Sequence, residues 1–264
     1  MALTDFKPIT TAFAGGANIG ADQLEALRSN DMLFERLLRG LLASPFVPTG
    51  FDGAVTTPQA DQVLFARTIE LSDKITLKDG LPLIWFAQES ILINVGAEIS
   101  GVGKGATGNG DLGGSGGGGN TALAVGNDCK VPVTGVPIKA GGLQGAIGTA
   151  LSAVEQAKWV NRLLAMLGIC QGGASGGGAD GGKGGGLVFL CAPNIAISGK
   201  IDVSGGNGSA NSGGGGGGAI ILRSVTPAQI LNEPANLVFK GGNGGGAGTG
   251  KGGDGFVFKS VIAV

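Results

Sequence analysis

Residues 201–208 read Ile-Asp-Val-Ser-Gly-Gly-Asn-Gly, and residues 237–244 read Leu-Val-Phe-Lys-Gly-Gly-Asn-Gly. A shift of 36 residues aligns these two stretches, and with no gap it also aligns the apolar runs that begin at Ile220 and Phe256. Each segment has a short apolar run, then a glycine-rich excursion, then a second apolar run. Self-similarity at a fixed spacing predicts two copies of one structural unit.

A shift of 104 residues indicates a third copy of this unit. It aligns 91–94 with 195–198, Leu83 with Leu187, and Glu98 with Asp202. In this copy, the glycine-rich excursion is split by an insertion at about 120–170. Apolar residues at helical spacing predict a helix near 149–167 within the insertion, with Trp159 in its core.

Glycine divides the chain into unlike parts. Only eight of the 56 glycines lie in residues 1–100. Leucines near helical spacing in 21–42 predict two short helices, so residues 1–48 are interpreted as an N-terminal helical attachment segment. We expect residues 49–100 to form a β-strand region with the first repeat strands, and residues 101–264 to form a glycine-rich repeat body.

Short apolar runs in the second region predict closely spaced strands. They lie at 75–77, 83–86 and 91–93, with Asp79-Gly80 and Glu89-Ser90 between them. Together with the repeats, they predict a mainly β fold of the β-solenoid or sandwich kind.

The glycine-rich stretches allow two interpretations. Ordering the fourteen positions of 205–218 costs on the order of 15–25 kcal/mol, which favours a flexible linker. The equal length of the second and third stretches favours order instead. Glycine in a polyproline-II-like helix turns its backbone groups outward in three directions, so neighbouring helices can bond one another. We therefore expect ordered polyglycine II excursions that stabilise one another.

Composition excludes several classes of function. The chain has no histidine, which removes the usual general base and the commonest zinc ligand, and its net charge of −1 offers no field for nucleic acid. Cys129, Cys170 and Cys191 form no CxxC pair. Cys191 is expected to be a buried hydrophobe, and a disulfide with Cys170 stays open. No metal or other cofactor is predicted.

Motifs of catalytic type occur by chance in so glycine-rich a chain. Both G-x-S-x-G matches, at 113–117 and 173–177, lack a histidine for a triad. The G-x-x-x-x-G-K matches at 177–183 and 245–251 are followed by glycine, where a phosphate loop needs Ser or Thr. Alternation places Glu98 and Asp202 on a solvent-exposed strand face. A carboxylate pair of a polysaccharide-degrading β-helix is the alternative for them, and we predict no enzyme.

The repeats resemble those of glycine-rich phage tail proteins, which pair β-helical strands such as 187–190 and 194–205 with polyglycine excursions. The chain is also similar in style to the tip adhesins of T-even long tail fibres. The resemblance covers about residues 81–264 and is compositional and architectural. It implies a virion protein of a tail fibre or tail tip that is made in the host cytoplasm and mediates or supports host-cell attachment.

The same resemblance implies the partners and the binding residues. Partners would be other tail or fibre proteins and a host surface glycan or outer-membrane protein, with the chain as a trimer or as a single copy on a trimeric fibre. No nucleic acid and no membrane span are expected, since no apolar stretch approaches about 18 residues. The candidate receptor-binding residues are polar positions in the glycine-rich loops: Asn109, Asp111, Asn207, Asn211 and Asn243. A purely structural tail or capsid protein and a bacterial glycine-rich surface adhesin are the alternatives.

Overall fold

The computed structural model describes residues 54–55, 63–111, 113–120, 124–130, 137–139, 141–150, 152 and 172–261. The expected attachment segment at 1–48 lies outside these residues. So does the predicted helix near 149–167, apart from residues 149, 150 and 152, which are not helical.

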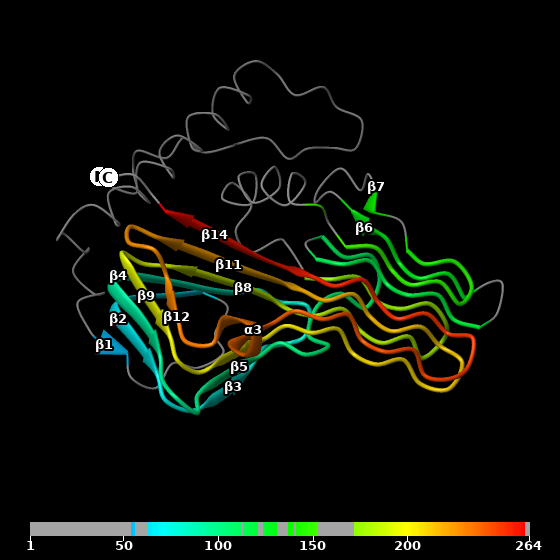
Figure 1. The fold of residues 1–264 in the computed structure, drawn as a ribbon, viewed down its shortest axis with the longest axis horizontal. Coiled ribbons are helices and arrows are strands. Elements are labelled where there is room, and N and C mark those ends of the chain that lie inside the picture. Colours follow the sequence, from blue (N-terminus) through cyan, green and yellow to red (C-terminus); the bar gives the residue numbers. More distant parts are fainter. Residues whose placement is uncertain are drawn as a thin grey trace, which may run out of the picture.

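The fold is mainly β, as the sequence predicted, and its one described helix is the four-residue α3. In the described part of the chain, most strands gather at one end, and the glycine-rich stretches run from them side by side to the other end (Figure 1). The elements are β1 (Ala54–Val55), β2 (Val63–Leu71), β3 (Lys74–Thr76), β4 (Leu83–Ile93), β5 (Glu98–Ser100), β6 (Cys129–Lys130), β7 (Pro137–Lys139), β8 (Leu187–Cys191), β9 (Asn194–Ile197), β10 (Lys200–Asp202), β11 (Ala219–Ser224), β12 (Gln229–Ile230), α3 (Glu233–Asn236), β13 (Leu237–Val238) and β14 (Phe256–Val261).

Two parallel sheets enclose the core. The larger sheet has the order β1-β2-β4-β8-β11-β14, with β9 and β12 branching from the second half of β4. The smaller sheet has the order β13-β10-β5-β3. Successive passes of the chain thus add strands to the same side of both sheets. A strand of a parallel sheet that is buried on both faces has an unbroken run of apolar residues. β8 is such a strand, because all five of its positions are buried.

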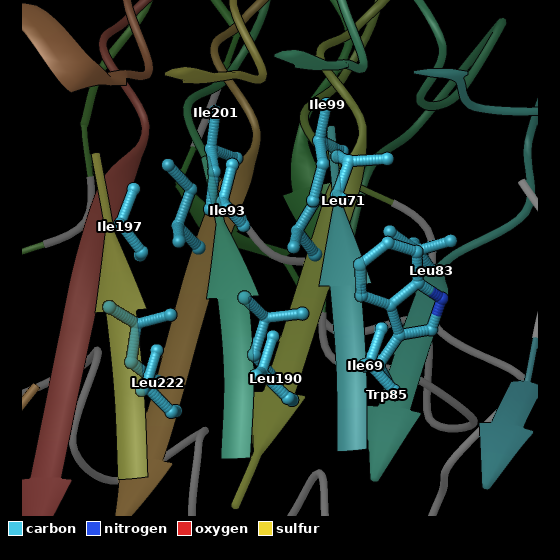
Figure 2. Packing of buried hydrophobic residues seen from close by; sticks show 14 of the residues in the cluster. Ile69, Leu71, Leu83, Trp85, Ile93, Ile99, Leu190, Ile197, Ile201 and Leu222 are labelled. Atoms are coloured by element: carbon cyan, nitrogen blue, oxygen red, sulfur yellow. The ribbon is translucent and has the colours of Figure 1, made fainter. Parts of the chain in front are cut away.

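Aliphatic side chains between the sheets stack in columns across the strands. Ile69 lies beside Ile91 and Ile91 beside Ile195, while Ile99 lies beside Ile201 in the smaller sheet. Figure 2 shows Ile69, Ile99 and Ile201 within this packed cluster, with Trp85 and Leu83 at one end of it. In a parallel ladder with fixed register, the same type of side chain falls in the same place at each pass.

The structure corrects two predictions of register and one of length. Ile201 does lie beside Leu237, as the shift of 36 aligns them, but Phe256 lies beside Ala219 and not beside Ile220. The last glycine-rich excursion is therefore one residue longer than the one before it, not equal in length. Likewise, Leu83 lies beside Val188, one residue from the predicted partner.

A further correction concerns Glu89 and Ser90, which were expected to separate two strands. Strand β4 passes through them without a break. It pairs with β8 before this point and with β9 after it, so the polar residues mark a change of partner. Glu89 keeps its side chain exposed, and an extended backbone needs no turn there.

Candidate functional site

The glycine-rich excursions pack side by side through backbone hydrogen bonds. In residues 113–120, consecutive N–H groups donate to different neighbours: Gly114 to Gly217, Ser115 to Thr149, and Gly116 to Asn127. Three residues further on the pattern recurs, with Gly117 donating to Gly214, Gly118 to Ala146, and Gly119 to Ala124. A repeat of three residues is the period of the polyproline II helix.

The carbonyl groups of consecutive residues in this segment also accept hydrogen bonds from different neighbours, in three other directions. Gly114 O accepts from Ala174, Ser115 O from Gly253, and Gly116 O from Gly142. Six neighbouring segments therefore surround 113–120, all held by main-chain groups. Residues 213–218 are surrounded in the same manner, by bonds to Gly177, Gly250 and Gly206 among others. Each segment is thus ordered by its neighbours and not by bonds within itself.

Glycine is required in this packing because the backbones touch. A Cβ atom on Gly216 would collide with the carbonyl oxygen of Gly114, and one on Gly114 would collide with that of Gly253. The two motif serines also belong to the packing. Ser115 and Ser175 are buried, and the Ser175 hydroxyl accepts a hydrogen bond from Asn127 Nδ2. They are structural and do not present a nucleophile to solvent.

Three of the predicted binding residues lie at the end of this layer farthest from the strands. Asn211 Oδ1 accepts a 2.7 Å bond from Asn120 Nδ2. This contact lies three residues further along both segments than the bond from Gly117 N–H to Gly214 O. Asn207 and Asn243 lie together on adjacent turns, where Asn207 Oδ1 accepts a 2.8 Å bond from the Asn243 N–H. All three side chains are exposed.

The sequence did not single out the residues that complete this far end. Gln144 Nε2 donates a 2.6 Å bond to Asn120 O, and the Ser209 N–H donates to Asp180 O. We call Asn120, Gln144, Asp180, Asn207, Asn211 and Asn243 the distal cluster. Turn residues adjoining the glycine stretches are the signal that could have indicated Asn120 and Asp180.

The other two predicted binding residues lie elsewhere. The Asp111 N–H donates to Gly172 O, close to the start of β8, so Asp111 is at the strand end of the layer. Asn109 Oδ1 accepts a 3.3 Å bond from the Asp128 N–H. The structure therefore does not bring Asn109 and Asp111 together with the distal cluster.

Charged side chains form pairs across the edge of the layer near the strands. Asp79 accepts hydrogen bonds from Lys104 at 2.7 Å and from Lys183 at 2.9 Å, and these two bonds lower the pKa of its carboxyl group. Asp254 is held by Lys240, Lys251 and the N–H of Gly241. The lysines of both G-x-x-x-x-G-K matches are thus used in ion pairs.

Asp202 and Glu98 do not occupy matching positions, contrary to the sequence prediction. Glu98 lies beside Lys200, two residues away from the expected partner. Asp202 is buried, with 8% of its surface exposed, and it accepts bonds from Lys200 Nζ at 2.7 Å and from the Ser204 N–H at 3.0 Å. Burial raises the pKa of Asp202, but these hydrogen bonds outweigh it and hold the pKa below its usual range.

The shifted pKa of Asp202 predicts a loss of stability in acid. A carboxyl group with a lowered pKa in the folded state stabilises the fold above its unfolded pKa of about 3.9 and ceases to do so as pH falls through the folded value. We expect the melting temperature to be flat near neutrality and to drop below about pH 4. Calorimetry of the wild type and Asp202→Asn across this range measures it, and the variant should lose part of the slope. Equal slopes would contradict the assignment.

Cys191 is a buried free thiol, as the sequence predicted. Burial raises its pKa to about 12, so the thiol is inert at neutral pH. Cys191 is free, and its alternative disulfide partner Cys170 lies outside the described residues. Within the described ranges, no group of His, Cys, Asp and Glu side chains could hold a metal ion.

Comparisons with protein-family models, curated proteins and solved structures find no match to this chain. In the part of the chain that the structure describes, no helix is long and apolar enough to cross a membrane.

Proposed function

We propose that this chain is a virion protein of a phage tail fibre or tail tip, in which the strands form a β-solenoid and the glycine-rich stretches form a polyglycine II lattice that carries the distal cluster toward a host surface. The observation that carries the proposal is the hydrogen bonding of 113–120 and 213–218 to six neighbours each. Main-chain bonds in several directions make a stiff support from residues that would otherwise be flexible.

The chemistry of the distal cluster fits a polar ligand. Among the described residues, the Nδ2 groups of Asn207 and Asn211 have no hydrogen-bond partner, while their Oδ1 atoms are held by neighbours. Amide donors that are fixed in direction and open to solvent suit the hydroxyl groups of a surface glycan or the polar loops of an outer-membrane protein. Host attachment through this end is therefore the function that we infer.

Binding of the purified chain to intact host cells tests this function. We expect the triple change Asn207→Ala, Asn211→Ala and Asn243→Ala to weaken binding at least tenfold, or about 1.4 kcal/mol, because it removes the open donors. Surface amides contribute little to folding, so the melting temperature should change little.

Asn109→Ala is the matched control, since Asn109 is also an exposed asparagine of the glycine-rich region but lies away from the distal cluster. It should leave binding unchanged. Unaltered binding by the triple variant would reject the distal cluster as the receptor site, and an absence of cell binding by the wild type would favour a purely structural role.

A further inference from the structure

The tripeptide Gly-Asn-Gly occurs three times in the glycine-rich region, centred on Asn109, Asn207 and Asn243. All three asparagine side chains are exposed. An asparagine that precedes glycine can lose its side-chain amide, because glycine has no Cβ that would shield its backbone nitrogen from the side chain. The three sites have the same residue on either side, so a difference between them in the folded protein must come from the tertiary structure.

The reaction joins the asparagine side chain to the backbone that follows it. The glycine nitrogen attacks Cγ of the asparagine, so an N–Cγ bond forms while the Cγ–Nδ2 bond breaks. The amide leaves as ammonia and takes up the proton of the glycine N–H. Water then opens the cyclic imide and leaves either aspartate or isoaspartate. The attack needs a glycine N–H that is free to lose its proton and an asparagine side chain that is free to turn toward it.

Two of the three sites meet neither requirement. At Asn207, the N–H of the following glycine donates a 2.9 Å bond to Asn243 O, and Oδ1 accepts a 2.8 Å bond from the Asn243 N–H. At Asn109, the N–H of the following glycine donates a 3.0 Å bond to Asp128 O, and Oδ1 accepts a 3.3 Å bond from the Asp128 N–H. Both the nitrogen that would attack and the side chain that would be attacked are therefore held.

The third site, Asn243, meets both requirements. The Gly244 N–H has no hydrogen-bond partner among the described residues, and neither has the Asn243 side chain. Only the main-chain groups of Asn243 are engaged, in the two bonds to Asn207 and the glycine after it. The Asn243 amide is thus free to turn toward a nitrogen that holds no hydrogen bond.

The place of Asn243 in the repeat gives the physical reason. Gly244 follows Gly208 by 36 residues, and both bonds that hold Asn207 come from the next pass of the chain. In the part of the chain that the structure describes, no pass comes after that of Asn243. Strands β13 and β14 are the outermost strands of their sheets, and the core is open beside β14, where a groove of about 800 Å³ lies. The corresponding groups at Asn243 and Gly244 are therefore left unpaired.

We propose that Asn243 is a site of spontaneous deamidation in the folded protein, and that the fold protects Asn109 and Asn207 from the same reaction. The product has a carboxyl group in place of the amide, so the distal cluster gains a negative charge. Isoaspartate also lengthens the backbone just before the bond from Gly245 N–H to Ser212 O. This inference does not depend on the proposed host attachment, because it is measured on the covalent structure of the chain.

Incubation of the whole folded chain in mildly alkaline buffer, followed by peptide mapping with mass spectrometry, tests the proposal. We expect Asn243 to convert at least tenfold faster than Asn109 or Asn207, a ratio equivalent to about 1.4 kcal/mol, because two hydrogen bonds must first open at each protected site. Aspartate and isoaspartate should both appear at position 243, since water can open the cyclic imide at either carbonyl group.

The same chain in denaturant provides the first control, because all three tripeptides then lose their hydrogen bonds and should convert at similar rates. Asn243→Gln provides the second. Glutamine keeps a side-chain amide, but its longer side chain closes the ring far more slowly. The main-chain groups that hold Asn207 stay in place in this variant, so its folded form should have no fast site.

Equal rates at the three sites of the folded chain would overturn the proposal, and so would faster conversion at Asn109 or Asn207 than at Asn243. An Asn243 that converts in denaturant but not in the folded chain would also overturn it. Aspartate as the sole product would do the same, because direct hydrolysis of the amide does not pass through the Gly244 nitrogen.

Discussion

Gly216→Ala is expected to lower the melting temperature by roughly 10–20 °C, the equivalent of about 3–6 kcal/mol for a chain of this size. The added Cβ would meet the backbone oxygens of Gly114 and Ser115, which have no flexible end that can move aside. The segments must separate instead. The bonds from Gly216 N–H to Ala174 O and from Ala174 N–H to Gly114 O would then be lost, and each unmade buried bond costs about 1–3 kcal/mol.

Gly108→Ala is the matched comparison for this change. No atom of the described residues lies within 4 Å of a Cβ at Gly108, so alanine should be neutral or slightly stabilising there, by up to about 1 kcal/mol. Calorimetry measures the difference, and amide exchange should show protection lost across 213–218 in the first variant only. Equal behaviour of the two variants would mean that the glycine-rich segments are not packed against one another.

Trp85→Ala is expected to cost about 3–5 kcal/mol. Trp85 has no exposed surface and lies at one end of the core cluster in Figure 2. It is among the largest of the fully buried side chains, so alanine would leave a cavity that the rigid parallel strands cannot close. Chemical denaturation with an unchanged m-value would show that the loss is one of stability alone.

Trp85→Phe separates volume from hydrogen bonding. Among the described residues, the indole Nε1 has no hydrogen-bond partner, so phenylalanine removes an unpaired buried donor along with some volume. We expect a loss of less than about 1.5 kcal/mol, well below that of alanine. If the two substitutions cost the same, the indole nitrogen must have an acceptor, and the cavity explanation would fail.

Much of the strand framework could be predicted from sequence. The runs at 83–86 and 187–190 are strands, and Ile201 lies beside Leu237, because side chains of like shape stack in a parallel ladder. The exact register between neighbouring strands could not be predicted, and the predicted pairings differ from the observed ones by one or two residues. A glycine-rich excursion that is one residue longer shifts the pairing of the strands that follow it, and a run of glycines shows no pattern from which that shift can be predicted. The pairing of Ala219 with Phe256 is an example.

The candidate site was predicted only in part, for a related reason. Asn207, Asn211 and Asn243 follow or interrupt glycine runs, and they do lie at the far end of the layer. Asn109 and Asp111 have the same sequence context but lie elsewhere. Local context identifies a turn without saying at which end of a long excursion that turn will lie.

By itself, the sequence determined that this protein is mainly β and that Cys191 is buried, because apolar side chains and their spacing encode which residues face a core. Only the tertiary structure decided which glycine segments are neighbours, that Asn120 joins Asn211, and that the core is open beside β14. A residue without a side chain carries no information about its partner. The neighbours of glycine are set by main-chain hydrogen bonds, which exist only once the surrounding strands are in place.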